Sequence, residues 1–233
     1  MTPKAIDRHI APALHPIEHI SFVAPNAQLL ANGATLFCLS GLQNDTSKIE
    51  LHFAAGSTTS DPLTASLCAG LLINGSHQKT AKQIQKALDA VGAYYDVSLT
   101  QETAVVTLYA LKNQLYNAYL IFHENLFGAI FPAKEVKDLV HSRRQKFLVQ
   151  EQKVSFIAQR YFQRSLLAGS SYAKQIQLSD FDHADRAAIQ AFHAQHYLCG
   201  LKKVYLVGDL QEATIKAFAL LLEQYQSKLP QSA

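Results

Sequence analysis

Residues 49–76 read IELHFAAGSTTSDPLTASLCAGLLINGS and contain a strand, a loop and a helix in that order. Apolar and polar residues alternate over 49–53, which predicts a strand with one buried face. Asp61-Pro62 predicts the start of a helix, because aspartate accepts hydrogen bonds from the first free N–H groups and proline suits the first turn. We expect this helix to end near Ile73, since Asn74-Gly75 favours a turn.

The same signals continue on both sides of this stretch. Asn32-Gly33 lies between two apolar runs, which is the strongest short signal for a β-hairpin. Thr80 and Gly92 predict the two ends of another helix. We expect further strands over 94–99, 103–111 and 203–207, and further helices over 114–127, 132–167 (with a weak break at 150–152), 182–197 or 185–197, and 214–226. This order predicts an α+β fold, in which helices cover mainly one face of an antiparallel or mixed sheet.

Composition excludes several classes of protein. The chain has 233 residues, of which 48% are hydrophobic and 17% charged, as in ordinary globular domains. Its 21 basic and 18 acidic residues give a net charge of +3, which is too balanced to indicate nucleic-acid binding. Three cysteines without C-x-x-C spacing support neither a disulfide framework nor a cysteine zinc site.

No segment has the length and apolarity of a membrane span, and the N-terminus has no signal-peptide pattern. The compartment stays open between cytoplasm and, if a signal has been removed, periplasm. We expect an extended arm over residues 1–16, one domain over 17–230 and a tail over 231–233. The chain ends close to the expected end of this domain, which suggests a fragment of a longer protein. Whether a second, similar domain follows is also open.

A series of short motifs, in register along the chain, resembles the N-terminal half-domain of the pitrilysin/insulinase and mitochondrial-processing-peptidase family of zinc peptidases (M16). Each motif is weak alone, but together they extend from about Asn32 to Pro230. They are Asn32-Gly33, the A-G-S at 55–57, L-I-N-G-S at 72–76, V-G-A at 91–93, Q-E-T at 101–103, S-R-R at 142–144 and L-V-G-D at 206–209. The resemblance implies the α+β half-domain fold of that family.

The family's zinc helix carries H-x-x-E-H, in which two histidines bind zinc and the glutamate activates water. Alignment on Gly75 places Ser66, Ala69 and Gly70 at these three positions. A further glutamate ligand usually follows seven residues after the Glu of a Glu-Arg pair. Here Arg143 replaces the Glu of that pair and Gln150 falls at the ligand position, with Glu151 next to it. The resemblance therefore implies a peptidase fold without catalytic residues, and we expect no zinc and no other cofactor.

Two other groups of residues have spacings that could suit a metal ion. His193 and His196 are three apart on one predicted helix, but no third ligand is evident, and ordinary helix histidines are the simpler interpretation. His15-Pro16-Ile17-Glu18-His19 spells H-x-x-E-H by letters, but its proline and its surroundings predict extended chain rather than helix.

The family binds peptides against a sheet edge in the region of residues 94–102. Tyr94, Tyr95 and Glu102 are therefore the weak candidates for peptide contact.

The sequence leads to one functional hypothesis with two alternatives. The first is a catalytically inactive M16 domain that, as a non-catalytic subunit or half of a zinc-peptidase assembly, helps to enclose or bind extended peptides. Its expected partner is a second M16-type half-domain, an active M16 subunit or another copy of this chain. The alternatives are a structural or assembly subunit without peptide handling and, less favoured, an active metallopeptidase with ligands from elsewhere. Substrate and partner identity cannot be read from the sequence.

Overall fold

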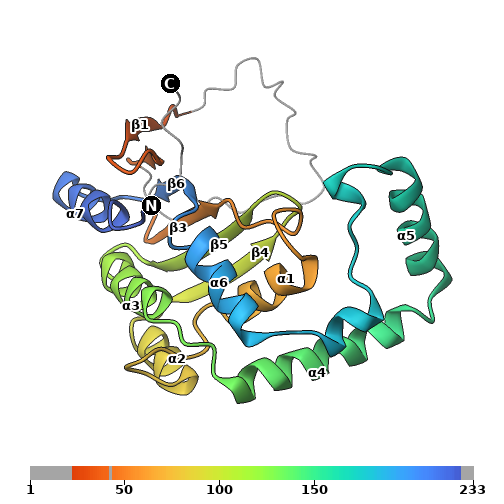
Figure 1. The fold of residues 1–233 in the computed structure, drawn as a ribbon. Coiled ribbons are helices and arrows are strands. Elements are labelled where there is room, and N and C mark those ends of the chain that lie inside the picture. Colours follow the sequence, from red (N-terminus) through yellow and green to blue (C-terminus); the bar gives the residue numbers. More distant parts are fainter. Residues whose placement is uncertain (1–22, 42–43, 227–233) are drawn as a thin grey trace, which may run out of the picture.

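The computed structural model describes residues 23–41 and 44–226. The arm expected over 1–16, the residues His15, Glu18 and His19, and the tail over 231–233 lie outside the described residues. The described part contains one six-stranded sheet, seven α-helices and two short 3-10 helices (Figure 1). The strands are β1 (Asn26–Leu29), β2 (Thr35–Leu39), β3 (Thr46–Phe53), β4 (Tyr94–Leu99), β5 (Ala104–Leu111) and β6 (Leu201–Val207). The helices are α1 (Pro62–Gly70), α2 (Ala81–Ala90), α3 (Leu115–Phe127), α4 (Ala133–Gln150), α5 (Val154–Leu166), α6 (Arg186–His196) and α7 (Glu212–Leu222), with 3-10 helices η1 (Ser171–Ala173) and η2 (Leu178–Asp182).

The sheet is mixed, with strand order β1-β2-β6-β3-β5-β4. Only the β2–β6 pair is parallel among the described strands, and the other pairs are antiparallel. The hairpin expected at Asn32-Gly33 joins β1 to β2, and Gly33 has a φ of 82°, which glycine adopts without strain. The expected α+β fold with a mixed sheet is confirmed.

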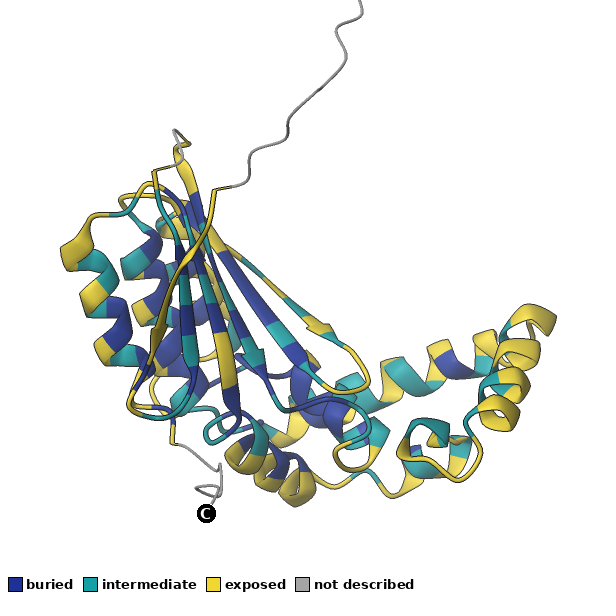
Figure 2. Ribbon diagram, turned by 90° about the horizontal axis from the view of Figure 1, so that it is seen from above, coloured by how far each residue is buried: buried dark blue, intermediate teal, exposed yellow. Residues whose placement is uncertain are grey.

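One face of the sheet forms the core. Ile49, Leu51 and Phe53 of β3 are fully buried, whereas Lys48 and Glu50 lie on the other face and form a salt bridge of 2.8 Å. Phe53 packs against the rings of Tyr197 and Tyr225, with centroids 5.1 Å and 5.7 Å apart. The helices cover mainly this apolar face, as expected from the alternating pattern of the strands (Figures 1 and 2).

Most predicted ends of elements hold to within a few residues. Helix α2 begins with a capping box between Thr80 and Gln83, and α6 begins at Asp185 rather than Asp182. Helix α1 ends at Gly70 and not near Ile73. The next three residues, Leu71 to Ile73, are all buried and form a turn. A turn can bury three consecutive side chains on one core, whereas a helix would direct one of them away.

Helices α4 and α5 extend from the rest of the domain, and we call them the α4–α5 arm. The weak break expected near residues 150–152 is real, since α4 ends at Gln150 and α5 begins at Val154. In Figure 1, α5 stands apart from the sheet, and in Figure 2 it is coloured mostly exposed. Helix α5 has no buried residue. No helix in the described ranges combines the length and the apolar character needed to cross a membrane.

Candidate functional site

Helix α1 presents the three positions that the sequence identifies as degenerate. Asp61 fixes its first turn, because its carboxylate accepts hydrogen bonds from the Thr64 N–H at 2.7 Å and the Thr64 hydroxyl at 2.8 Å. Ser66, Ala69 and Gly70 follow at i, i+3 and i+4, so they share one face of this helix. All three line a hollow of about 290 Å³ between α1 and β4.

Arg143 of α4 lies directly against this face. Its guanidinium donates a hydrogen bond to the Ser66 hydroxyl. A Cβ atom added at Gly70 would be 2.8 Å from the Nη2 atom of Arg143 and 3.0 Å from the Cδ2 atom of Leu139. Two small residues of α1 thus give the arginine side chain its space, and the side chain joins the two positions where the family has histidines.

The environment of this guanidinium is unusual for a surface arginine. Arg143 is only partly exposed, and burial lowers the pKa of its guanidinium. An arginine still carries its charge at neutral pH. Within the described ranges, Arg143 forms no salt bridge, and Ser66 is its one hydrogen-bond partner. The hollow is also lined by Asp96 of β4, but this exposed carboxylate forms no salt bridge with Arg143, so the half-buried positive charge has no paired carboxylate among the described residues.

The residues present here do not fit a zinc ion. A catalytic zinc site needs three protein ligands drawn from imidazole, thiolate and carboxylate groups. Ser66, Ala69 and Gly70 offer a single hydroxyl oxygen, and the adjacent guanidinium repels a divalent cation. In residues 23–41 and 44–226, no group of three or more His, Cys, Asp or Glu side chains is placed to hold a metal ion.

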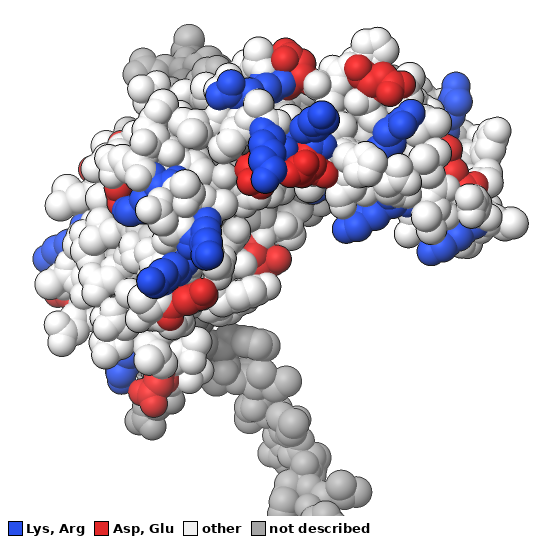
Figure 3. Space-filling model, turned by 90° about the horizontal axis from the view of Figure 1, so that it is seen from below, with Lys and Arg blue, Asp and Glu red and all other residues white. Residues whose placement is uncertain are grey.

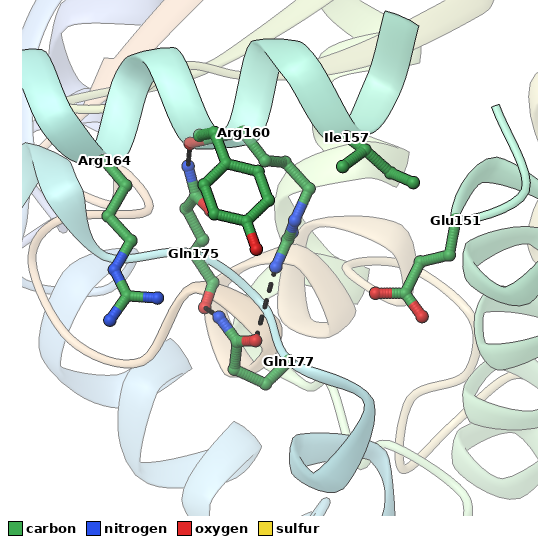
Figure 4. A pocket seen from close by; sticks show the side chains of 7 residues that line it. Glu151, Ile157, Arg160, Arg164, Gln175 and Gln177 are labelled. Carbon is green, nitrogen blue, oxygen red and sulfur yellow. Dashed lines mark hydrogen bonds between the residues drawn. The ribbon is translucent and has the colours of Figure 1, made fainter. Parts of the chain in front are cut away.

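The two residues near the position of the further glutamate ligand separate at the end of α4. Gln150 lines a groove of about 550 Å³ together with Ser66 and Arg143. Glu151 instead lines an adjacent hollow of about 370 Å³, where it lies across from Arg160 and Arg164 of α5 (Figure 4). The structure therefore groups Gln150, and not Glu151, with the degenerate motif.

The larger of these spaces, which we name the α1–α4–α5 groove, runs from α1 across α4 to α5 and the segment 172–181. Sequence reasoning missed two of its basic residues, Arg160 and Lys174. No local sequence pattern could have identified them, because they come together with Arg143 only through the packing of α4, α5 and the segment 172–181. The groove is lined by Ser57, Pro62, Leu63, Ser66, Leu99, Gln101, Arg143, Lys146, Phe147, Gln150, Phe156, Gln159, Arg160, Gln163, Tyr172, Lys174, Gln175, Ile176 and Phe181.

The three candidates for peptide contact lie in different surroundings. Tyr95 of β4 lines the same hollow as Ser66 and Gly70. Tyr94 points to the opposite face of the sheet, where it is 65% exposed and stacks on Tyr109. Glu102 lies in the turn between β4 and β5, and its carboxylate accepts a hydrogen bond from the Tyr172 hydroxyl. Only Tyr95 therefore shares a site with the degenerate motif.

Of the two helix histidines, His193 lies in the core and His196 is partly buried. His193 is 4% exposed, and its ring packs against the rings of Phe131 and Tyr197. Burial lowers the pKa of His193 to about 4. The Nδ1 atom of His196 lies 2.8 Å from the carbonyl oxygen of Ala54. These contacts give both rings a structural role.

Charge over the surface is mixed. On the face drawn in Figure 3, basic and acidic side chains are interspersed, and no broad field of one sign covers it. Some of these opposite charges form ion pairs at the surface, such as Lys79–Glu124 at 2.9 Å and Lys216–Glu212 at 2.7 Å.

Comparison with known proteins identifies the family. The protein-family model described as "Insulinase (Peptidase family M16)" matches residues 38–177 of this chain. A crystal structure of a peptidase M16 inactive domain from Pseudomonas fluorescens is similar, with a TM-score of 0.82 and 23% identity over 91% of this chain and 53% of that chain. A protease from Helicobacter pylori is similar with a TM-score of 0.75 and 13% identity over 89% of this chain and 52% of that chain.

A search of curated proteins gives no match. The chain spans about half the length of each of these two solved structures. The match of the family model covers more than half of the chain, and the fold agrees with both structures. The chain therefore belongs to peptidase family M16 and has the fold of one M16 half-domain.

Proposed function

We propose that this chain is a non-catalytic M16 half-domain, which pairs with a second M16-type half-domain and helps to enclose extended peptides. One observation carries the proposal: the Arg143 guanidinium lies against Ser66 and Gly70, at the positions where the family motif has its two histidines.

The face of α1 that carries Ser66, Ala69 and Gly70 has no residues that could carry out peptide hydrolysis. A zinc peptidase needs a metal to polarise the peptide carbonyl and to lower the pKa of the attacking water. It also needs a base, and Ala69 stands where the family has glutamate. We propose that this half-domain binds no zinc and does not hydrolyse peptides on its own.

Exposed apolar residues support pairing with another domain. Val154, Phe162 and Leu166 of α5 are 81%, 65% and 67% exposed, so one helix of the α4–α5 arm carries a run of large apolar side chains in solvent. Apolar surface that is left uncovered in one domain is typical of interaction sites. The partner in this proposal is a second M16-type half-domain, carried by the same chain, by an active subunit or by another copy of this chain.

The edge of the sheet supports the peptide-binding part. Strand β4 is the last strand in the sheet order, so one of its edges has no neighbouring strand within the described residues. Free N–H and C=O groups on such an edge can pair with an extended peptide. The hollow beside β4 contains Tyr95 and reaches the degenerate positions of α1, so a peptide on this edge would lie next to Arg143.

Zinc analysis tests the central claim. Elemental analysis of protein that is free of affinity tags and has not met a chelator should give zinc far below one equivalent. The same preparation should leave fluorogenic peptides uncleaved. One tightly held equivalent of zinc, together with cleavage that a chelator abolishes, would contradict the proposal.

Pairing and peptide binding need separate measurements. Light scattering with and without an active M16 subunit measures the association, and titration with unstructured peptides measures the binding. Association without any peptide binding would favour the structural-subunit alternative and remove the peptide part of the proposal.

A further inference from the structure

The α1–α4–α5 groove differs in charge from the molecule as a whole. The chain has 21 basic and 18 acidic residues, which is nearly balanced. The lining of the groove contains four basic residues (Arg143, Lys146, Arg160 and Lys174) and neither Asp nor Glu. Like charges in one concave site raise its potential, because the low-dielectric walls focus the field.

Acidic residues on the neighbouring segments form no salt bridge with the four groove cations, although Glu102 bonds to the groove residue Tyr172. Glu102 accepts the hydrogen bond from Tyr172, and Asp180 caps η2 through the Gln177 N–H at 2.7 Å. Asp182 forms its salt bridge with Arg144 at 3.6 Å, not with a groove residue. Glu151 lines the adjacent hollow shown in Figure 4, which shares Arg160 and Gln175 with the groove. None of the four cations of the groove forms a salt bridge within the described residues, although Glu151 lies across from Arg160 and Asp96 lines the hollow that Arg143 also lines.

Arg143 gives the groove a partly desolvated donor. Its one hydrogen bond within the described ranges goes to a neutral hydroxyl, although a guanidinium can donate five. A carboxylate fits the remaining donors, because it can accept two parallel N–H bonds from the planar fork. Arginine and carboxylate pair more strongly when water is partly excluded, as it is here.

The floor of the groove is apolar. Phe147 and Phe181 are buried beneath it, and Phe156 and Ile176 pack against the same core. The guanidinium carbon of Arg160 lies 5.3 Å from the ring centroid of Phe147 and 5.5 Å from that of Phe156. The groove thus combines cations with aromatic surface, which suits a ligand that has a carboxylate and an apolar side chain close together.

We propose that the α1–α4–α5 groove binds acidic peptide segments, with a carboxylate on Arg143 and a neighbouring apolar side chain on the floor formed by Phe147 and Phe156. This proposal rests on the peptide-holding part of the proposed function and names the class of peptide. A peptide is favoured over a small anion for two reasons. The groove reaches Leu99 at the end of the open edge strand β4, and glutamine amides along its wall can bond to a peptide backbone.

Fluorescence anisotropy with three labelled peptides tests the proposal. The peptides have the same length and the same leucine and phenylalanine positions, and carry either Glu, Gln or Lys at the remaining positions. The full chain should bind the Glu peptide about tenfold or more tightly than the Gln peptide, since a charge-assisted hydrogen bond contributes that much. This preference should weaken as salt is raised.

Charge-neutralising variants locate the binding. Arg143→Gln should reduce the affinity for the Glu peptide by about tenfold and leave that for the Gln peptide nearly unchanged. Lys146 and Lys174 are exposed, so the Lys146→Gln/Lys174→Gln double variant should fold normally and lose part of the preference. Lys86→Gln on α2 removes one exposed positive charge outside the groove and is the matched control that should change nothing.

The outcomes separate the two proposals. Equal binding of the three peptides, tighter binding of the Lys peptide, or a preference that survives in both groove variants would overturn the acidic groove while leaving peptide binding in place. Failure of every peptide to bind would contradict the peptide part of the proposed function as well. Free decanoate that competes as strongly as the Glu peptide would show that any apolar carboxylate is sufficient, and would overturn the assignment to peptides.

Discussion

The substitution Gly70→Ala tests whether position 70 now serves packing. Its Cβ would lie 2.8 Å from the Arg143 Nη2 atom and 3.0 Å from the Leu139 Cδ2 atom, both closer than ordinary van der Waals contact. Overpacking of this kind costs about 1–3 kcal/mol. The better helix propensity of alanine stabilises the fold by about 0.5–1 kcal/mol and offsets part of this cost. We expect a net loss of about 1 kcal/mol, which lowers the melting temperature by roughly 2–4 °C in a domain of this size.

A double-mutant cycle isolates the contact with the arginine. In an Arg143→Ala background the closest atom is absent, so Gly70→Ala should cost close to nothing there. The coupling between the two positions should be about 1 kcal/mol. Chemical denaturation of the wild type, the two single variants and the double variant measures all four free energies of unfolding. Equal effects of Gly70→Ala in both backgrounds would refute the reasoning that Arg143 occupies the space beside Gly70.

Three further predictions concern stability. Asp61→Ala should lower the free energy of unfolding by about 1 kcal/mol, because α1 loses its N-cap, and Asp61→Asn should restore most of it in urea denaturation. Leu51→Ala in the centre of β3 should cost about 2–5 kcal/mol, since the side chain is fully buried; an unchanged urea midpoint would contradict this placement of the core. The third concerns pH. The pKa of His193 is about 4 in the folded state and about 6.5 when unfolded, so the unfolded state binds the extra proton. Stability should therefore be fully present above pH 6.5 and decline as pH falls toward 4. His193→Phe should make this decline shallower in thermal melts across that range, and the remainder is expected from His123, whose pKa burial also lowers to about 4.

The sequence by itself determined most of the local structure, because its signals act between near neighbours. The alternation over residues 49–53 gave a strand with one buried face, and Asn32-Gly33 gave the first hairpin. Asp61 and Thr80 began two helices through side-chain bonds to the first free N–H groups. The loss of the H-x-x-E-H residues is likewise readable in the sequence, since it depends on residue identity alone.

Only the tertiary structure decided what replaced that motif. Arg143 and Ser66 are 77 positions apart, and their hydrogen bond exists because α4 packs across α1. The sequence placed Arg143 near the missing glutamate but contained nothing to show that its side chain faces the two small residues. In the same way, β6 is inserted between β2 and β3, although it is the last strand in the chain.

The charge of the groove also arises from packing between distant segments. Arg143, Arg160 and Lys174 belong to α4, α5 and the loop after η1, and none of these segments has a basic run that distinguishes it from a solvent-exposed helix face. Periodicity and capping act over a few residues, so they determine where helices and strands begin and end. Contacts between segments far apart in the sequence decide how α4 and α5 pack against the rest of the domain. They also decide which side chains share one cavity, and no local spacing determines these contacts.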